Sequence, residues 1–438
     1  MNKIIASIFL WVICIHSIAQ QDSAKLPFAI ANEKKLSDED LAHKKEGTYV
    51  TAVPQLSSDP VNGFGYGAEG MLYFNGKKND PFYAYTPYQA KVSLSVFNTT
   101  KSQNEIVLGL DMPYIFKSKW RLRIEGIYEN DPNMVYFGVS EKSLAGLTNP
   151  QTGVVYANYD KYISSLSANY KNYNRYTETN NLMLDVSAER SFFKSKMRAL
   201  VGFRYANMGI FTLDGNSLLQ NDFASARTLG IGRTTVTMLQ AGLVYDTRDL
   251  ESDPGKGVFA EVTDELSLQA LGSNYNFNKV FAQVKVYQRL FPSVFKKLIF
   301  AMRGGVASVN GNAPVYEYME EWGSEGGVYD VVGGRFALRG YKQARFVGNY
   351  LDFVNTELRA RFTQFTILKQ HLALSAVPFF DVGGVGNTPS RLFGYASNYH
   401  YAEGLGLRIA WNVNTVLRFD YAISKEDRQF FFQFGHAF

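Results

Sequence analysis

Residues 120–129 read WRLRIEGIYE and alternate between two kinds of side chain. One face carries Trp120, Leu122, Ile124, Gly126 and Tyr128, and the other carries Arg121, Arg123, Glu125 and Glu129. A period of two residues predicts a β-strand with one apolar and one charged face. The apolar face would form the core of a soluble sandwich but would contact lipid in a membrane barrel. This stretch alone leaves both architectures open.

The same alternation recurs from Thr48 almost to the last residue and predicts about sixteen strands. They are 48–58, 64–75, 88–98, 104–113, 120–129, 177–190, 196–208, 234–249, 257–270, 276–290, 298–309, 351–363, 371–383, 400–411, 415–423 and 429–438. Aromatic residues make up 15% of the chain and charged residues only 19%, and the mean hydropathy is -0.17. A near-neutral average is compatible with a membrane barrel, because its strands show only one face to lipid.

The lengths of the connections favour the barrel. The long ones, 130–176, 209–233, 310–350 and 384–399, all follow odd-numbered strands, and most of the others are short. An even strand number with long loops at one end and tight turns at the other is typical of bacterial outer-membrane barrels. We therefore predict an all-β fold, a 16-stranded antiparallel transmembrane β-barrel over 48–438, in contact with outer-membrane lipid.

Both ends of the predicted sheet are unusual. The last strand carries Phe430, Phe432, Phe434 and Phe438 on one face, and a terminal aromatic strand is the signal that outer-membrane insertion machinery reads. Pro54 lies in the first strand, although proline cannot donate a ladder hydrogen bond and belongs at a sheet edge. Either the seam between the first and last strands is weakly bonded, or Pro54 marks a bulge or a misplaced strand start.

The segment before the barrel divides into two parts. Residues 1–19 resemble an export signal, with a cation, an apolar core and a small-residue cleavage site before Gln20. Cys14 is the only cysteine and lies in this segment, so we expect no disulfide or thiolate site in the mature chain. Residues 20–47 form a polar tail, periplasmic or plug-like, with one short helix that starts at Ser37 and stops at Gly47.

Several classes of function find no support in the sequence. The net charge of +5 is too small and too dispersed to indicate nucleic-acid binding. None of the 5 histidines has a serine, cysteine or glutamate at motif spacing, and no phosphate loop, zinc spacing or calcium loop occurs. We therefore expect no catalytic residues, no cofactor and no metal.

Four short sequences resemble, in order, the hallmark motifs of the BamA/TamA superfamily, the bacterial surface antigen barrels. They are Tyr245–Asp249 with Pro254 and Gly257, then Leu338–Tyr341, Asn355–Arg359 and Phe379–Gly383. Family members that insert or translocate proteins usually carry polypeptide-transport-associated domains before the barrel. Residues 20–47 cannot hold one, so the chain resembles the short subgroup that lacks them.

The alternation places Glu357 and Asp381 on the lumen side of neighbouring strands, where a loop tucked into the barrel could present Arg339 to either. The resemblance implies that this contact holds the extracellular loop inside, with Gly340 allowing a sharp turn and Tyr341 wedging the loop. The other interpretation is a solvated arginine in an ordinary extracellular loop.

The motif Asp246, Arg248, Asp249, Pro254 and Gly257 lies where a strand meets a tight turn, so we expect an architectural role for it. The resemblance implies that the barrel inserts or translocates polypeptide, or lipid, at the outer membrane through the seam. A plugged passive pore, or a structural subunit of an outer-membrane complex, is the alternative. Polypeptide substrates and other outer-membrane or periplasmic proteins are the implied partners.

Overall fold

The computed structural model describes residues 25–59, 62–325, 328–330, 332–394 and 399–438. The expected export signal, residues 1–19, lies outside them.

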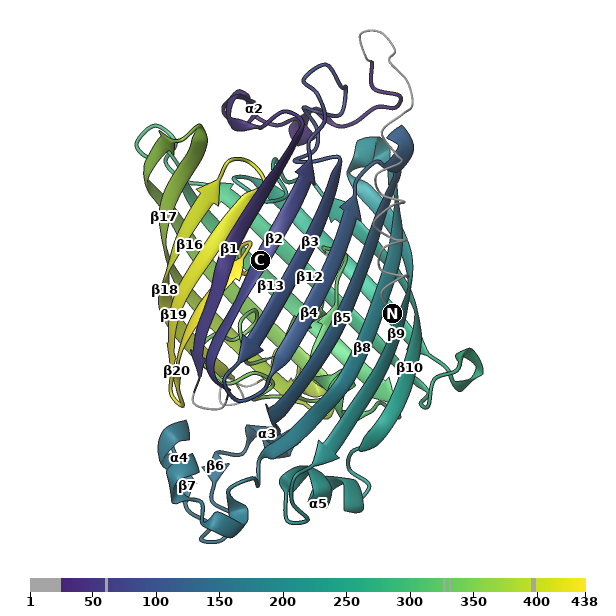
Figure 1. The fold of residues 1–438 in the computed structure, drawn as a ribbon, viewed down its shortest axis with the longest axis vertical. Coiled ribbons are helices and arrows are strands. Elements are labelled where there is room, and N and C mark those ends of the chain that lie inside the picture. The colour runs from purple at the N-terminus through teal and green to yellow at the C-terminus, as the bar shows by residue number, and fades with distance from the viewer. Residues whose placement is uncertain (1–24, 60–61, 326–327, 331, 395–398) are drawn as a thin grey trace.

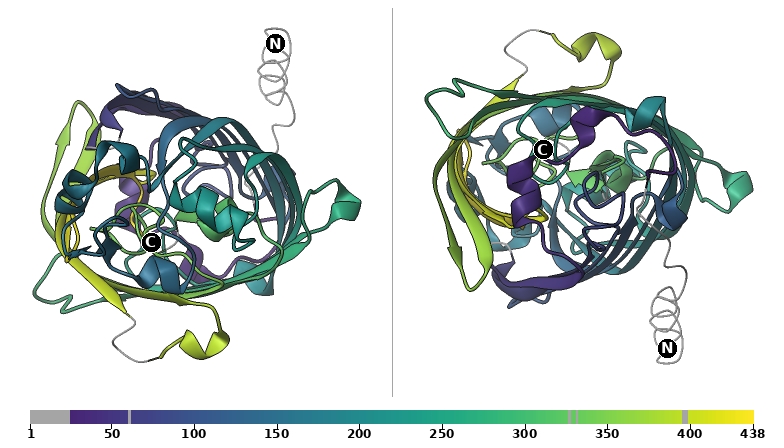
Figure 2. Two further views of the ribbon diagram at one scale, coloured as in Figure 1. Left: turned by 90° about the horizontal axis from the view of Figure 1, so that it is seen from below. Right: turned by 90° about the horizontal axis from the view of Figure 1, so that it is seen from above.

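Sixteen strands form one antiparallel sheet that curves round a central lumen (Figures 1 and 2). They are β1 (Thr48–Asp59), β2 (Gly63–Phe74), β3 (Ala90–Thr99), β4 (Asn104–Met112), β5 (Trp120–Val135), β8 (Arg175–Phe192), β9 (Met197–Thr212), β10 (Gly232–Asp246), β11 (Gly257–Ser267), β12 (Phe277–Arg289), β13 (Leu298–Gly311), β16 (Tyr350–Ile367), β17 (Gln370–Gly386), β18 (His400–Trp411), β19 (Thr415–Ser424) and β20 (Arg428–Phe434). The prediction of a 16-stranded barrel is confirmed.

Alternation along the strands separates lipid-facing from lumen-facing side chains. On β5, Arg121 and Arg123 are buried in the lumen while Trp120 on the outer face is 41% exposed. Leu239 on β10 and Val201 on β9 are likewise exposed on the outer wall. Apolar side chains that face outward exclude a sandwich, in which they would pack against a second sheet.

No helix among the described residues is long and apolar enough to cross a membrane.

The three longest connections, after β5, β9 and β13, lie at one end of the barrel, and the other end carries mainly tighter turns (Figure 1). The long loops carry α3 (Glu141–Leu144), β6 (Leu147–Thr148), β7 (Val155–Tyr156), α4 (Tyr159–Ser165), η4 (Ala168–Tyr170), α5 (Leu218–Ala224), η7 (Val315–Tyr318), β14 (Glu320–Trp322), β15 (Val328–Asp330) and η8 (Pro389–Arg391). The strand pairs β6–β7 and β14–β15 are separate small sheets, which the two-residue alternation did not predict. The end with the tight turns is the periplasmic one by the convention of such barrels.

The tail crosses the periplasmic mouth, which Figure 2 shows from above. It contains η2 (Asn32–Lys34) and α2 (Asp38–His43). The helix starts as predicted, with the Ser37 hydroxyl accepting a hydrogen bond from the Asp40 amide, but it ends at His43, before Gly47. It ends early because Lys44 is extended and its ammonium donates to the carbonyls of Tyr83 and Thr86.

β1 and β20 are the two ends of the sheet and lie beside each other in Figure 1. Within the described part of the chain no backbone ladder joins them. β20 ends at Phe434, opposite Leu417, so Thr415 of β19 lies beyond the end of β20. There the Thr415 hydroxyl lies 3.3 Å from that of Thr51 on β1.

Candidate functional site

The connection between β13 and β16 enters the lumen. Its stretch Val332–Val347 contributes Val332, Ala337, Leu338, Tyr341, Ala344, Phe346 and Val347 to the largest buried apolar cluster of the barrel. An ordinary surface loop would leave such side chains in solvent, so this connection is the inward-tucked loop that the sequence predicts. We call residues 332–347 the inward loop.

Arg339 is the contact between the inward loop and the barrel wall. Its Nε and Nη2 donate to the two oxygens of Asp381 at 2.8 and 2.9 Å, and its backbone amide donates to Oδ2 at 3.1 Å. Nη1 donates to Glu357 and to Asp420, both at 2.9 Å. The guanidinium also lies 3.6 Å from the centre of the Phe379 ring. A planar five-donor fork suits this arrangement and a lysine ammonium does not.

The wall supplies the three carboxylates from three strands. Glu357 lies on β16, Asp381 on β17 and Asp420 on β19. All three side chains and Arg339 itself are fully buried. Arg359 and Arg408 add further bonds to Glu357 at 2.8 and 3.0 Å. Burying charged groups costs desolvation free energy. This network therefore fixes the position of the inward loop more than it adds to the stability of the barrel.

Asp420 and Arg408 are the parts of this site that sequence reasoning missed. Arg408 bonds both Asp420, at 2.5 Å, and Glu357. Asp420 lies in the predicted strand 415–423 with its neighbours Leu417 and Tyr421 in the outward phase, so the alternation already placed it in the lumen. No motif distinguished it from other lumen-facing charges.

Gly340 and Tyr341 follow Arg339 in the inward loop and pack against the barrel wall and the loop itself. Gly340 has a φ of +94°, and a Cβ there would come within 3.1 Å of the Ile423 backbone. Its carbonyl accepts a hydrogen bond from the Ser424 hydroxyl at 2.6 Å. Tyr341 is buried with its ring edge-on to Phe346.

The strand-turn motif at the end of β10 has two parts. Asp249 caps the turn, accepting hydrogen bonds from the amides of Leu250, Gly255 and Lys256. Gly257 has a φ of +113°, and a Cβ there would come within 2.5 Å of the Thr247 carbonyl. The buried Pro254 completes the turn. Asp249, Pro254 and Gly257 thus shape the turn after β10.

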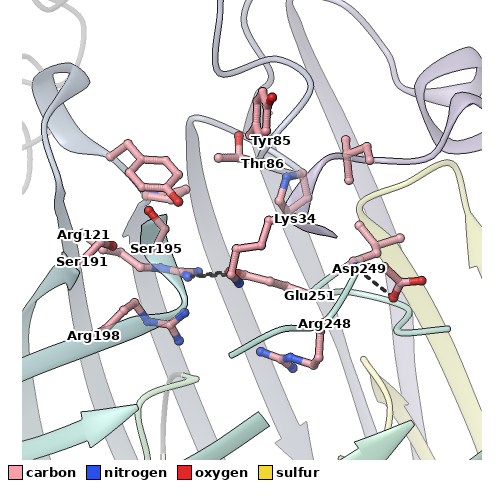
Figure 3. A pocket seen from close by; sticks show the side chains of 15 residues that line it. Lys34, Tyr85, Thr86, Arg121, Ser191, Ser195, Arg198, Arg248, Asp249 and Glu251 are labelled. Atoms are coloured by element: carbon pink, nitrogen blue, oxygen red, sulfur yellow. Dashed lines mark hydrogen bonds and ion pairs between the residues drawn. The ribbon is translucent and has the colours of Figure 1, made fainter. Parts of the chain in front are cut away.

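Asp246 does more than shape the turn. It is fully buried and binds Arg198 at 3.1 Å, Arg248 at 3.1 Å and Lys34 of the tail at 3.2 Å. Figure 3 shows Lys34 among Arg198, Arg248 and Glu251. Burial lowers the pKa of Lys34, and the charge of Asp246 opposes that shift. Asp246 therefore ties the tail to the barrel wall.

The four terminal phenylalanines do not share one face, which corrects the prediction. Phe430, Phe432 and Phe434 lie in the outward phase of β20, opposite Tyr421, Phe419 and Leu417. The strand ends there because Gly435 turns the chain with a φ of +79°, and Phe438 is buried in the lumen. Its ring lies 5.3 and 5.4 Å from the guanidiniums of Arg303 and Arg359.

An outward apolar wall, a lumen of paired charges and an inward loop fixed to that wall define a bacterial outer-membrane β-barrel. Residues 85–438 match the Omp85 superfamily domain, and the chain belongs to this superfamily, which confirms the resemblance drawn from its motifs. Residues 26–89 match a domain of unknown function, DUF5982. No curated protein matches the sequence.

The fold is shared with solved structures, among them the following two. One is BamA from Haemophilus ducreyi lacking POTRA domains 1-3, with a TM-score of 0.52 and 16% identity over 89% of this chain and 70% of that one. The other is CdiB from Escherichia coli, with a TM-score of 0.52 and 10% identity over 88% of this chain. The chain spans 62% of the length of CdiB, less than two thirds.

Proposed function

We propose that this barrel inserts or translocates polypeptide, or lipid, at the bacterial outer membrane by opening the seam between β1 and β20. The observation that carries the proposal is the seam itself, where no ladder joins the two strands in the described part of the chain. Unpaired backbone groups next to lipid are costly. A strand edge without a ladder of hydrogen bonds can exchange its partner strand at a lower free-energy cost than an edge held in a continuous ladder.

The inward loop supports this mechanism by bracing the wall beside the seam. Arg339 joins β16, β17 and β19 through their carboxylates. These strands can stay fixed while β20 and β1 separate. We further propose that other outer-membrane or periplasmic proteins are partners, and that the barrel has no catalytic centre.

A disulfide across the seam tests the proposal. The hydroxyls of Thr51 and Thr415 are 3.3 Å apart, so cysteines at both positions lie within reach of a disulfide. We expect the oxidised T51C/T415C variant to fold but to lower the abundance of other outer-membrane barrels in the native bacterium, because a bond from β1 to β19, just beyond the end of β20, restrains the separation of β1 from β20. Quantitative membrane proteomics measures this abundance.

The two single-cysteine variants and the reduced double variant are the controls, and all three should behave as the wild type. The proposal fails if the oxidised double variant maintains every other barrel at its normal level.

A plugged pore is the second candidate, favoured by the tail across the mouth and by the inward loop in the lumen. In that case deletion of residues 20–47 should change the single-channel conductance in planar bilayers, and loss of the protein should leave other barrels in the membrane. Unchanged conductance together with depleted barrels would favour the seam mechanism.

A further inference from the structure

Arg190 is a cation on the outer wall of the barrel. Along β8, Leu182, Leu184, Arg190 and Phe192 are exposed and share the outward phase. Trp120 on β5 lies directly opposite Arg190 in the strand register. The guanidinium carbon is 5.7 Å from the centre of the Trp120 ring and 5.5 Å from that of Phe192. Two rings thus flank the charge.

No carboxylate among the described residues lies within ion-pair distance of Arg190. An outward-facing arginine costs about 2–4 kcal/mol at the middle of a bilayer and about 0–1 kcal/mol near its surface. Arg190 lies two residues before the periplasmic end of β8, and tryptophan is enriched at the same membrane level. The charge therefore faces the headgroups of the leaflet on the periplasmic side.

The two turns beside Arg190 share one sequence. FKSK occurs at 116–119, before β5, and again at 193–196, after β8, and these two strands are neighbours. In both copies the phenylalanine and the first lysine have positive φ: 53° and 58° at Phe116 and Lys117, 46° and 57° at Phe193 and Lys194. Left-handed backbone costs about 1–2 kcal/mol per residue, and such strain gathers at functional positions.

The strained turns expose their apolar residues. Phe116 is 80% and Phe193 is 74% exposed, and Lys194 is exposed next to Phe193. Neither ring packs into the barrel, so the strain does not serve the core. Aromatic rings at headgroup level with a cation beside them fit the boundary between acyl chains and phosphates.

We propose that Phe116, Trp120, Arg190, Phe192, Phe193 and Lys194, the rim patch, bind an anionic phospholipid of the periplasm-facing leaflet. Arg190 binds the phosphate with its planar fork, and Lys194 adds a second positive charge. The four rings contact the glycerol and upper acyl region. This site does not depend on the proposed seam mechanism.

Native mass spectrometry of the full-length protein, released from detergent with either phosphatidylglycerol or phosphatidylcholine, tests the rim patch. We expect the wild type to prefer phosphatidylglycerol. Arg190→Gln should weaken its binding on the order of tenfold, since bonds to charged groups are the strong ones. Lys161→Gln removes an exposed cation from α4 at the opposite end of the barrel and should bind as the wild type does.

Retention of the compact form on unheated SDS gels separates loss of the site from loss of the fold. Trp120→Leu keeps the charge but removes one ring, so its affinity should lie between those of the wild type and Arg190→Gln. Equal phosphatidylglycerol binding by Arg190→Gln and Lys161→Gln overturns the proposal. So does a wild type that prefers phosphatidylcholine, or displacement of the lipid by inorganic phosphate, which would indicate a soluble anion.

Discussion

At Arg339, three carboxylates from three strands converge on one guanidinium. Replacing it with lysine keeps the charge but leaves too few donors for Asp381, Glu357 and Asp420 together. Removing one partner of a buried ion pair costs about 3–5 kcal/mol. We expect Arg339→Ala to lower the free energy of unfolding by this full amount and Arg339→Lys to lower it by a large part of it. Urea unfolding of the barrel in lipid vesicles measures both.

Lys425→Ala is the control, because it also removes a cation but at an exposed position in the β19–β20 connection. It should unfold as the wild type does. A wild-type midpoint for Arg339→Ala would mean that apolar packing alone holds the inward loop.

Part of this site could be predicted from sequence. Glu357 and Asp381 could be predicted because a motif contains them and the alternation places them in the lumen. Asp420 has the same alternation but no motif, and its partner Arg339 is 81 residues away in the sequence. The contact depends on curvature that brings β16 and β19 to one loop, which no local pattern encodes.

Among the elements, the packing of the tail against the periplasmic turns gives a testable prediction. Leu36 packs against Leu250 and Val413 of two periplasmic turns. Truncating a buried leucine to alanine typically costs about 2–5 kcal/mol. We expect Leu36→Ala to speed hydrogen exchange of residues 30–44 while exchange of the strands stays unchanged. Mass spectrometry of peptides from the folded protein measures both.

Lys35→Ala changes the exposed neighbour and should leave exchange at the wild-type rate. If the tail of Leu36→Ala exchanges as slowly as that of the wild type, the Lys34–Asp246 pair is enough to hold it.

Element boundaries were less predictable than element existence. All sixteen strands were found because contact with lipid forces a strict alternation on each of them. The predicted final strand is too long, since a period of two cannot reveal that Gly435 turns the chain. The pairs β6–β7 and β14–β15 are too short to show any period, and they depend on packing against the rest of their loops.

For the whole molecule, the property to test is which face of the sheet contacts lipid and which faces the lumen. Leu239 faces outward near the middle of β10, whereas Gln55 of β1 faces the lumen. We expect Leu239→Arg to lower the free energy of unfolding in lipid vesicles by about 2–4 kcal/mol. Gln55→Arg should change it little, because that side chain has polar neighbours.

Equal effects of the two substitutions would contradict the assignment of outer and inner faces.

The residues after β20 have a consequence for movement of the barrel wall. Arg303 lies beside the Phe438 ring and also donates to the Phe336 carbonyl of the inward loop. Arg359 bonds both the Phe438 carbonyl and Glu357. Pulling β20 sideways would therefore withdraw residues 435–438 from the same two guanidiniums that steady the loop. Displacement of β20 would then reach the Phe336 side of the inward loop, while Arg339 keeps its three carboxylates on β16, β17 and β19.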